Sequence, residues 1–338
     1  MSFADIHDQD DTQGYEIAEY PKYLSPSSFK MWRRCKTEFY LKRMSPIKRK
    51  IARRPQGIAA AVGNGFDSFI KTILLEHTTG EAHDAYEFLG KSISNKEYLQ
   101  EASHAGKRLA SIYIQTAYES LLLEKPHSFD LEILEDFEGI PIRGFVDLLV
   151  GDKEVLDWKT RGYGGAPKSP TPGWCKKWKG GVLQNVVHKR HKDPLETLNE
   201  DWALQVAMYA FALGHEPGDH LTTGIDELSM RNVAHPDEIT LDSVCVTQIR
   251  TYISPSFQHE LAADLHNAWR DITRGEFGYC TPAKNVCYRF RQLCEASGHC
   301  EAFKRFQPII LGGRSPKTRD KGGYSVSDLK RMLGEIGG

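Results

Sequence analysis

Residues 129–158 contain three short runs of β-forming residues, which the turn segments FEGIP and GDK separate. Short runs of this kind, divided by tight turns, predict an antiparallel meander. Apolar residues at helical spacing predict helices over residues 29–44, 59–76, 95–124, 198–213 and 255–274. Two further strands are expected near residues 225–233 and 243–253. We therefore expect an α/β fold, with a central mixed β-sheet flanked by helices.

The 338 residues are 40% hydrophobic and 26% charged, which is ordinary for a globular protein. No run of eighteen apolar residues is present, and the acidic N-terminus lacks the apolar region of a signal peptide. We therefore expect no membrane contact and residence in the cytoplasm. The expected organisation is a mobile acidic tail over residues 1–22, one domain over residues 23–305, and a flexible tail with a short C-terminal helix over residues 306–338.

The net charge is −1, from 44 basic and 45 acidic side chains. A protein that coats nucleic acid without specificity is usually more basic, so this composition disfavours that class. Near-neutrality remains compatible with a metal site, since such a site needs clustered carboxylates.

Two aspartates and a lysine stand out within the meander. Asp147 lies on its second run and Asp157 on its third, and Lys159 follows two residues later. Residues two apart on a strand point to the same face, so Asp157 and Lys159 share one. A three-residue turn over residues 151–153 would place Asp147 opposite Asp157, whereas a two-residue turn would put the carboxylates on opposite faces. We predict the three-residue turn.

Two carboxylates opposed on one face repel each other unless a cation lies between them, and Mg²⁺ and Mn²⁺ prefer such oxygen ligands. Lys159 would orient or help deprotonate a metal-bound water that attacks phosphorus. The alternative is an ion pair at a strand end, which is common and contributes little. The pattern predicts a metal-dependent phosphodiester hydrolase that uses Asp147, Asp157 and Lys159.

The segments GFVDLL and VLDWKT, which contain these residues, resemble two strands of the PD-(D/E)XK nuclease superfamily. The resemblance is to its RecB-like branch, especially phage and CRISPR-associated members with iron–sulfur clusters. LQVAMYAFAL resembles the Q-x-x-x-Y helix of this branch, SPSSFKMWRRCKTEFYLKRM its opening helix with one cysteine, and CYRFRQLCEASGHC its closing cysteine cluster. The resemblance spans roughly residues 24–303 and implies a restriction-endonuclease-like core. It also implies an exonuclease that processes DNA ends, in phage recombination or replication.

Further site residues are implied by the same resemblance. Gln205 and Tyr209 lie four apart and so share a helix face, which is expected near the active site and the DNA backbone. The alternative reading places Tyr209 simply in the core. Asp67 stands where the family usually has a metal-binding histidine. Since a carboxylate can replace imidazole on Mg²⁺ or Mn²⁺, we expect Asp67 to be a third ligand beside Asp147 and Asp157, the alternative being a solvated aspartate on a helix face.

Four of the seven cysteines lie between Cys280 and Cys300. In a reducing compartment, the spacing Cys287-x6-Cys294-x5-Cys300 indicates a soft metal rather than disulfides. A cluster needs four thiolates, and Cys35 and Cys280 compete for the fourth position. The resemblance implies Cys35 and a structural 4Fe–4S cluster that joins the chain ends, while four thiolates would equally suit structural Zn²⁺.

A basic segment follows Lys159. Residues 161–192 contain eight Lys or Arg and no Asp or Glu, interleaved with Tyr163, Trp174 and Trp178. Positive charge follows phosphates and aromatic rings stack on unpaired bases, so this segment could guide a DNA strand. The alternative is a flexible solvated loop.

Three functions are weighed on these patterns. The first is a Mg²⁺- or Mn²⁺-dependent deoxyribonuclease acting on single-stranded DNA or DNA ends. The second is a nuclease-like DNA-binding or assembly subunit with weak or no cleavage, which docks a protein partner through its C-terminal helix. The third is a redox-sensing iron–sulfur protein. The oligomeric state is left open.

Overall fold

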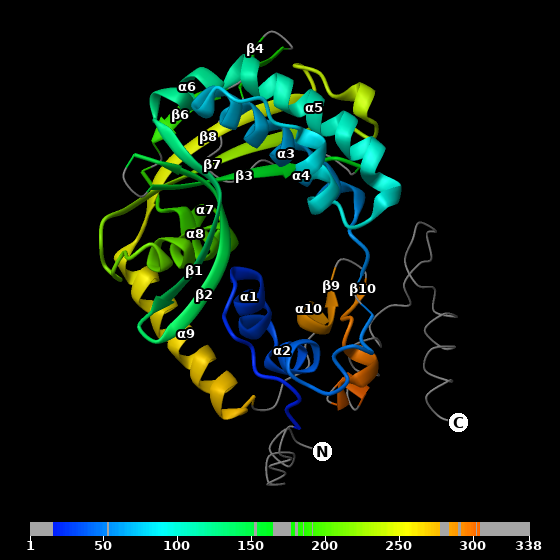
Figure 1. The fold of residues 1–338 in the computed structure, drawn as a ribbon, viewed down its shortest axis with the longest axis vertical. Helices are drawn as coiled ribbons and strands as arrows, with labels where there is room; N and C mark the ends of the chain where they lie inside the picture. Colours follow the sequence, from blue (N-terminus) through cyan, green and yellow to red (C-terminus); the bar gives the residue numbers. More distant parts are fainter. Residues whose placement is uncertain are drawn as a thin grey trace. The chain divides into compact units, whose positions relative to one another are not determined.

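The computed structural model describes residues 16–52, 54–151, 154–164, 177–179, 182–184, 186–190, 192–277, 284–289, 292–301 and 303–304. The chain divides into two compact units, and Figure 1 shows its course. The first, here called the sheet unit, contains Tyr23–Ser27 and Arg54–His266. The second, here called the cysteine unit, contains Ser28–Arg53 and the described residues up to Lys22 and from Asn267 onward. The domain boundaries expected from sequence stay a prediction.

The sheet unit contains a six-stranded mixed sheet with the order β1-β2-β3-β7-β8-β6. Its strands are β1 (Pro126–Phe137), β2 (Ile140–Val150), β3 (Glu154–Arg161), β6 (Val186–Arg190), β7 (Leu221–Met230) and β8 (Val244–Ile253). β1, β2 and β3 pair antiparallel, β3 pairs parallel with β7, β7 antiparallel with β8, and β8 parallel with β6. The predicted meander and the central mixed sheet are confirmed.

The register between β2 and β3 follows the predicted turn. Val150 pairs with Glu154, and the pairing continues through Leu149 with Val155. Residues 151–153 therefore separate the two strands, which confirms the prediction of a three-residue turn. This register decides which side chains of β2 and β3 share a face, because a shift by one residue would reverse them.

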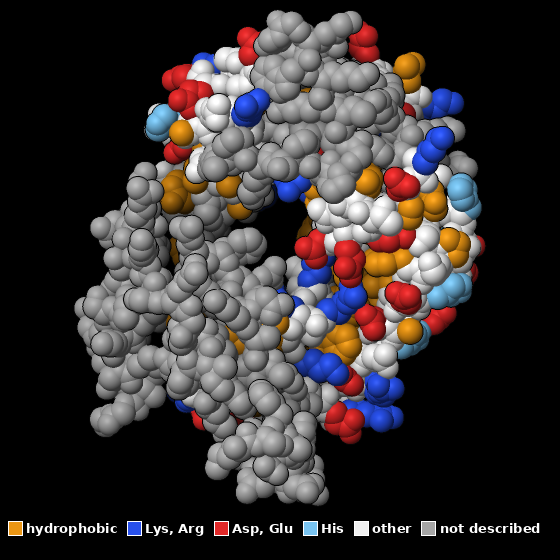
Figure 2. Space-filling view, turned by 180° about the vertical axis from the view of Figure 1, so that it is seen from behind, with side chains coloured by type: hydrophobic (Ala, Val, Ile, Leu, Met, Phe, Trp, Pro, Cys, Tyr) orange, Lys and Arg blue, Asp and Glu red, His pale blue; other side chains and the backbone are white. Residues whose placement is uncertain are grey.

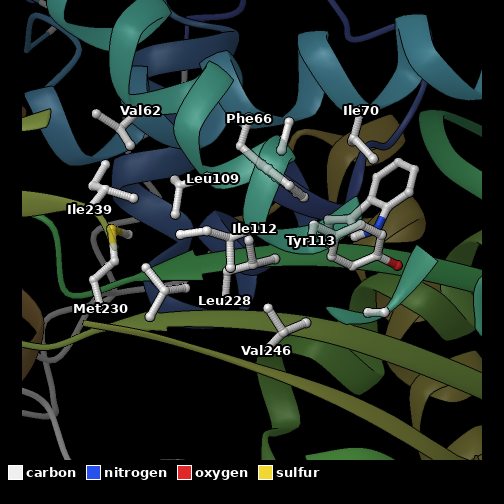
Figure 3. Close-up of a cluster of buried hydrophobic side chains, with 14 of the residues drawn as sticks. Val62, Phe66, Ile70, Leu109, Ile112, Tyr113, Leu228, Met230, Ile239 and Val246 are labelled. Carbon is white, nitrogen blue, oxygen red and sulfur yellow. The ribbon is translucent and has the colours of Figure 1, made fainter. Parts of the chain in front are cut away.

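Helices α3 (Ile58–Thr79) and α5 (Leu99–Thr116) pack against each other and against the sheet. Their backbones approach closely, since a Cβ added to Gly106 would lie 2.4 Å from the carbonyl carbon of Gly65. Figure 3 shows Phe66 and Tyr113 of these helices over side chains from the sheet, within one buried hydrophobic cluster. This packing fixes one face of α3 against the sheet and so positions the polar residues of the helix.

Within the described residues, α3 is the one helix long and apolar enough to cross a membrane, and half of its most apolar stretch is buried inside the protein. This is the pattern of a core helix, and it is weak support for a membrane span.

The remaining helices of the sheet unit agree with the prediction in part. They are α4 (Ala85–Ser92), η2 (Lys96–Tyr98), α6 (Tyr118–Leu123), α7 (Leu195–Leu198), α8 (Glu200–Ala212), η3 (Pro236–Glu238) and α9 (Pro255–Arg274), the last of which continues into the cysteine unit. The helix predicted over residues 95–124 is wrong as a single element, because the backbone leaves helical geometry at Ala117, with φ −132° and ψ −16°. Helix α4 was not predicted; it is short, and Asp84 caps its first turn.

The cysteine unit contains most of α1 (Pro26–Arg34), then α2 (Lys36–Arg43), α10 (Lys284–Cys287), β9 (Tyr288–Arg289), β10 (Gln292–Leu293) and η4 (Ser297–His299). The single helix predicted over residues 29–44 is wrong, because the chain breaks at Cys35. This residue is extended, with φ −160° and ψ 105°, and its Sγ accepts a hydrogen bond from the N–H of Glu38, 3.3 Å away. Cys35 therefore acts as the N-cap of α2, a position at which a side-chain acceptor stabilises the first turn.

Candidate active site

Asp147 of β2 and Asp157 of β3 occupy adjoining positions of the antiparallel pair. The strand pairing reaches Leu148 with Leu156, and these aspartates come next on the two strands. Their carboxyl groups contact each other through a hydrogen bond. The N–H of Trp158 also donates to Oδ2 of Asp147, at 3.3 Å. The structure thus brings together the two carboxylates singled out from the sequence.

Lys159 and two residues of α8 complete this side of the site. The ammonium of Lys159 forms an ion pair with Oδ2 of Asp157, and Nζ lies 3.5 Å from Oε1 of Gln205. Gln205 donates from Nε2 to Oδ1 of Asp157, at 3.1 Å, and its Nε2 lies 3.3 Å from the hydroxyl of Tyr209. Tyr209 is buried with its ring against Gly144, where a Cβ would lie 2.2 Å from Cε1. Tyr209 is therefore a packed side chain whose hydroxyl reaches the site.

Helix α3 supplies Asp67 together with a lysine that the sequence analysis did not single out. Lys71 lies one turn after Asp67, and its Nζ is 2.8 Å from Oδ2 of Asp67. The same Nζ is 3.3 Å from Oδ1 of Asp147 and 3.0 Å from Oδ1 of Asp130 on β1. The spacing of Asp67 and Lys71 was a readable signal, because residues four apart on a helix face each other. Asp130 carried no such signal, since only the tertiary structure brings β1 to α3.

The carboxyl groups of the site differ in acidity. Burial, opposed by Lys159 and reinforced by Asp147, raises the pKa of Asp157 to about 7. Burial, followed by the charge of Asp147, likewise raises the pKa of Asp67 to about 7, although Lys71 opposes this. Burial also disfavours the charged form of Asp147, but Lys71 and Lys159 outweigh it and hold the pKa of Asp147 below its ordinary value. Neighbouring carboxyls thus have opposite shifts, which is frequent at functional sites.

The donor atoms suit a hard divalent cation. Asp67, Asp147 and Asp157 offer carboxylate oxygens, the ligands that Mg²⁺ and Mn²⁺ prefer. Oδ1 of Asp67 is buried without a hydrogen-bond partner. Within the described part of the chain, no group of His, Cys, Asp and Glu side chains has the spacing of a formed metal site. The carboxylates instead hold the ammonium groups of Lys71 and Lys159, so the residues fit the metal by the chemistry of their donor atoms.

Four cysteines line one small pocket of the cysteine unit. Cys35, Cys287, Cys294 and Cys300 surround it together with apolar neighbours such as Phe303. Burial raises the pKa of the Cys294 thiol to about 12. None of the described cysteines is in a disulfide, and the structure shows no cysteine-ligated cluster within the residues it describes. Cys280 lies outside the described residues, so the choice between Cys35 and Cys280 as fourth ligand stays a prediction.

The basic segment is described only in part. Its strands β4 (Lys177–Lys179) and β5 (Val182–Gln184) pair with each other, and β6 joins the central sheet beside β8. Trp174, the side chain of Trp178 and the predicted C-terminal helix lie outside the described residues. The predicted strand-guiding role of residues 161–192 therefore stays a prediction. On the face shown in Figure 2, the described acidic and basic side chains are interspersed, in keeping with the net charge of −1.

The fold and the site together describe an α/β protein whose sheet presents two opposed carboxylates and a lysine on adjacent strands. Residues 23–173 match the sequence model of the PD-(D/E)XK nuclease superfamily, and this segment contains every charged residue of the site. The match covers 151 of the 338 residues, and over this segment the chain is similar to members of that superfamily. No curated protein matches the chain. A solved structure described as a "Putative exonuclease" from Eubacterium rectale is similar at 14% identity and a TM-score of 0.43, over 91% of this chain and 92% of that one.

Proposed function

We propose that this protein is a metal-dependent nuclease that hydrolyses DNA phosphodiesters at the site formed by Asp147, Asp157 and Lys159. The observation that carries this proposal is the contact between the two carboxylates on adjacent strands, with the lysine ion-paired to one of them. The superfamily match supports it, because the matched segment includes these residues. The finer assignment, an exonuclease of the RecB-like branch acting on DNA ends, rests on the resemblance of the sequence motifs alone.

Asp67, Asp147 and Asp157 would hold Mg²⁺ or Mn²⁺, which supplies positive charge beside the phosphate and lowers the pKa of coordinated water. The chain's own residues then have separate tasks. Lys159 lies between Asp157 and Gln205, where its ammonium can hold the attacking water by a hydrogen bond. Gln205 fixes the carboxylate of Asp157 and so limits its rotation. A fixed set of donors needs no reorganisation during the reaction, which is the main source of electrostatic catalysis.

One feature of β2 supports a nucleic-acid substrate. Phe145 lies two residues before Asp147 and is 48% exposed. The guanidinium of Arg143 lies 6.0 Å from the centre of its ring. At about 3.3 Å per strand residue, Phe145 lies roughly 6.6 Å from Asp147 along β2, on the same face of the strand. We propose that a base stacks on Phe145 while the adjacent phosphate lies at the carboxylates, as aromatic platforms do for single strands.

For the cysteine pocket, we propose a structural 4Fe–4S cluster held by Cys35, Cys287, Cys294 and Cys300. Two backbone N–H groups already donate to these sulfurs, from Glu38 to Cys35 at 3.3 Å and from Phe303 to Cys300 at 3.4 Å. Hydrogen bonds of this kind stabilise thiolate ligands and influence the reduction potential of an iron–sulfur cluster. Structural Zn²⁺ is the alternative, and thiolate ligands of either metal suit a reducing cytoplasm.

The test of the nuclease is cleavage of end-labelled DNA by the full chain, purified without oxygen, with Mg²⁺ or Mn²⁺ and with EDTA. We expect metal-dependent cleavage that Asp157→Ala and Lys159→Ala reduce by at least ~10²-fold, as removal of catalytic groups does. Lys91→Ala is the matched control, because Lys91 is an exposed lysine of α4 with its own carboxylate partner, Glu87. Equal cleavage by Asp157→Ala would refute the proposed site. Metal-dependent DNA binding without cleavage by the wild type would favour the assembly subunit instead.

A further inference from the structure

Lys71 is a buried cation in the carboxylate site, and the nuclease reaction described above does not use it. Its side chain is 4% exposed, and its ammonium contacts Asp67, Asp130 and Asp147 at 2.8, 3.0 and 3.3 Å. A buried ammonium costs free energy unless several hydrogen-bonded carboxylates compensate it. Lys71 has three carboxylate partners, whereas an ion pair has one. These carboxylates together hold the side chain of Lys71 in its protonated, cationic form within the site.

The backbone of β1 is shaped around this contact. Asp130 has a left-handed φ of 51°, a conformation that aspartate tolerates better than most residues. Phe129 pairs with Leu148 and Leu131 with Val146, so the register of the two strands places Asp130 opposite Asp147. The carboxylates of both residues reach Lys71. Three separate elements, α3, β1 and β2, thus supply the anions around one ammonium.

The charge balance of the site limits the number of metal ions. Lys71 and Lys159 contact four carboxylates between them: Asp67, Asp130, Asp147 and Asp157. When all four are ionised, two negative charges remain, which one divalent cation neutralises. Two-metal nuclease sites need two divalent ions about 3.5–4 Å apart, with carboxylates bridging them. The ammonium of Lys71 occupies the place between carboxylates that a second ion would need.

We propose that Lys71 is a built-in replacement for a second metal ion, so that this site binds a single Mg²⁺ or Mn²⁺. This inference rests on the proposed nuclease site and adds the number of metal ions that the site binds. Lys71 is a positioning residue: it holds Asp67 and Asp147 in place for the one ion and excludes another. Without Lys71, the carboxylates of Asp67, Asp130 and Asp147 form a vacant second site for a hard divalent cation.

The test counts Mn²⁺ bound to the full chain by calorimetry and by the electron paramagnetic resonance signal of free Mn²⁺. Thiolates are poor ligands for this hard ion, so the cysteines of the pocket do not add to the number of bound Mn²⁺ ions. We expect one Mn²⁺ per chain for the wild type and for Lys71→Arg, which keeps the cation, and two for Lys71→Met. Lys91→Met makes the same change at an exposed lysine and should still bind one Mn²⁺ per chain. Adding Asp130→Asn to Lys71→Met should return the count to one, because the second ion loses a ligand.

Two results would overturn the inference: a wild type that binds two Mn²⁺ with similar affinity, or a Lys71→Met protein that still binds one. Thermal unfolding and circular dichroism of each variant show whether it is folded, and Lys71→Gln replaces Lys71→Met if the latter is not. Failure of the nuclease proposal is distinguishable, because binding is counted without cleavage. A wild type that binds one Mn²⁺ and leaves DNA intact supports the single-ion site and refutes the nuclease activity. A wild type that cleaves DNA with two Mn²⁺ bound supports the activity and refutes the single-ion site.

Discussion

Gln205 of α8 donates a hydrogen bond from Nε2 to Oδ1 of Asp157 on β3, at 3.1 Å. The same side chain lies 3.5 Å from the ammonium of Lys159 through its other atom, Oε1. The amide of Gln205 thus contacts both members of the Asp157–Lys159 ion pair. Its N–H group donates to the carboxylate, and its oxygen faces the ammonium. This relationship restrains both side chains in addition to the ion pair that they form with each other.

Removing this amide should slow the reaction without unfolding the protein. Gln205→Ala deletes one hydrogen bond to a carboxylate, which contributes about 1.5–3 kcal/mol. We expect kcat to fall by about 10–100-fold, since each 1.4 kcal/mol is a factor of about ten. Steady-state kinetics on labelled DNA measure this loss. Gln205→Glu, which keeps the shape but places a third carboxylate beside Asp157, should be at least as impaired; normal kcat in both variants would show that Gln205 has no positioning role.

The metal-free protein should lose stability as the pH rises from about 4 to about 7. The pKa values of Asp157 and Asp67 are raised to about 7, so the folded state holds protons that the unfolded state releases near pH 4. Their contribution is therefore fully present below the unfolded pKa and is lost as the pH passes the folded one. Asp147 has a lowered pKa, so it titrates below this window.

Urea unfolding in EDTA at about pH 5 and about pH 8 measures this dependence. The free energy of unfolding should be lower at the higher pH, and Asp157→Asn should reduce the difference because the amide does not titrate. Saturating Mn²⁺ should restore stability at the higher pH, since it binds the ionised carboxylates. A free energy of unfolding that rises with pH in EDTA would contradict the prediction.

Cys35 has two roles that a pair of substitutions can separate. Its sulfur caps α2, and we propose that it is also a cluster ligand. Cys35→Ser keeps a good capping oxygen, whereas Cys35→Ala loses the cap at a cost of about 1 kcal/mol. We expect both variants to lose iron and the visible absorbance after anaerobic purification, and only Cys35→Ala to lose helix stability as well.

The matched control is Cys245→Ala, because Cys245 is a buried cysteine of β8 in the sheet unit and does not line the cysteine pocket. It should retain its iron. Iron content that survives in Cys35→Ser would exclude Cys35 as a ligand and favour Cys280, and zinc in place of iron would identify the alternative metal.

Phe145 provides a test of the substrate path. Phe145→Ala removes the proposed stacking platform, and stacking on one base contributes about 1–3 kcal/mol. We expect KM for single-stranded DNA to rise roughly tenfold, with kcat and the Mn²⁺ count unchanged. Phe145→Trp should preserve KM, because any aromatic face can stack. Leu134, an exposed apolar residue of β1, supplies the control Leu134→Ala. An unchanged KM in Phe145→Ala would remove Phe145 from the substrate path.

The sequence by itself determined the meander and the face on which its charges lie. Alternating β-forming residues and two turn segments defined β1, β2 and β3, and the length of residues 151–153 set the register. That register is local, since strands joined by a short turn have few ways to pair. For the same reason, the adjoining positions of Asp147 and Asp157 were predictable from the sequence alone.

Local pattern was insufficient where the backbone angles of one residue or a distant contact decided the outcome. The helical spacing over residues 29–44 predicted one helix, but Cys35 turns its sulfur to cap α2 and breaks it. The periodicity of the segment could not show this, because the break lies in the backbone angles of one residue. The division of the chain into two units likewise depends on which segments share a core.

The tertiary structure alone decided the environment of Lys71. Asp67 is its helical neighbour, but Asp130 and Asp147 lie 59 and 76 residues away along the chain. Each carboxylate alone would be a solvated charge; together they hold a cation that is almost fully buried. Burial lowers the effective dielectric constant, so charges brought together by folding act on one another far more strongly than in the unfolded chain. The sequence specifies which charges are present, and the fold determines which of them share one site.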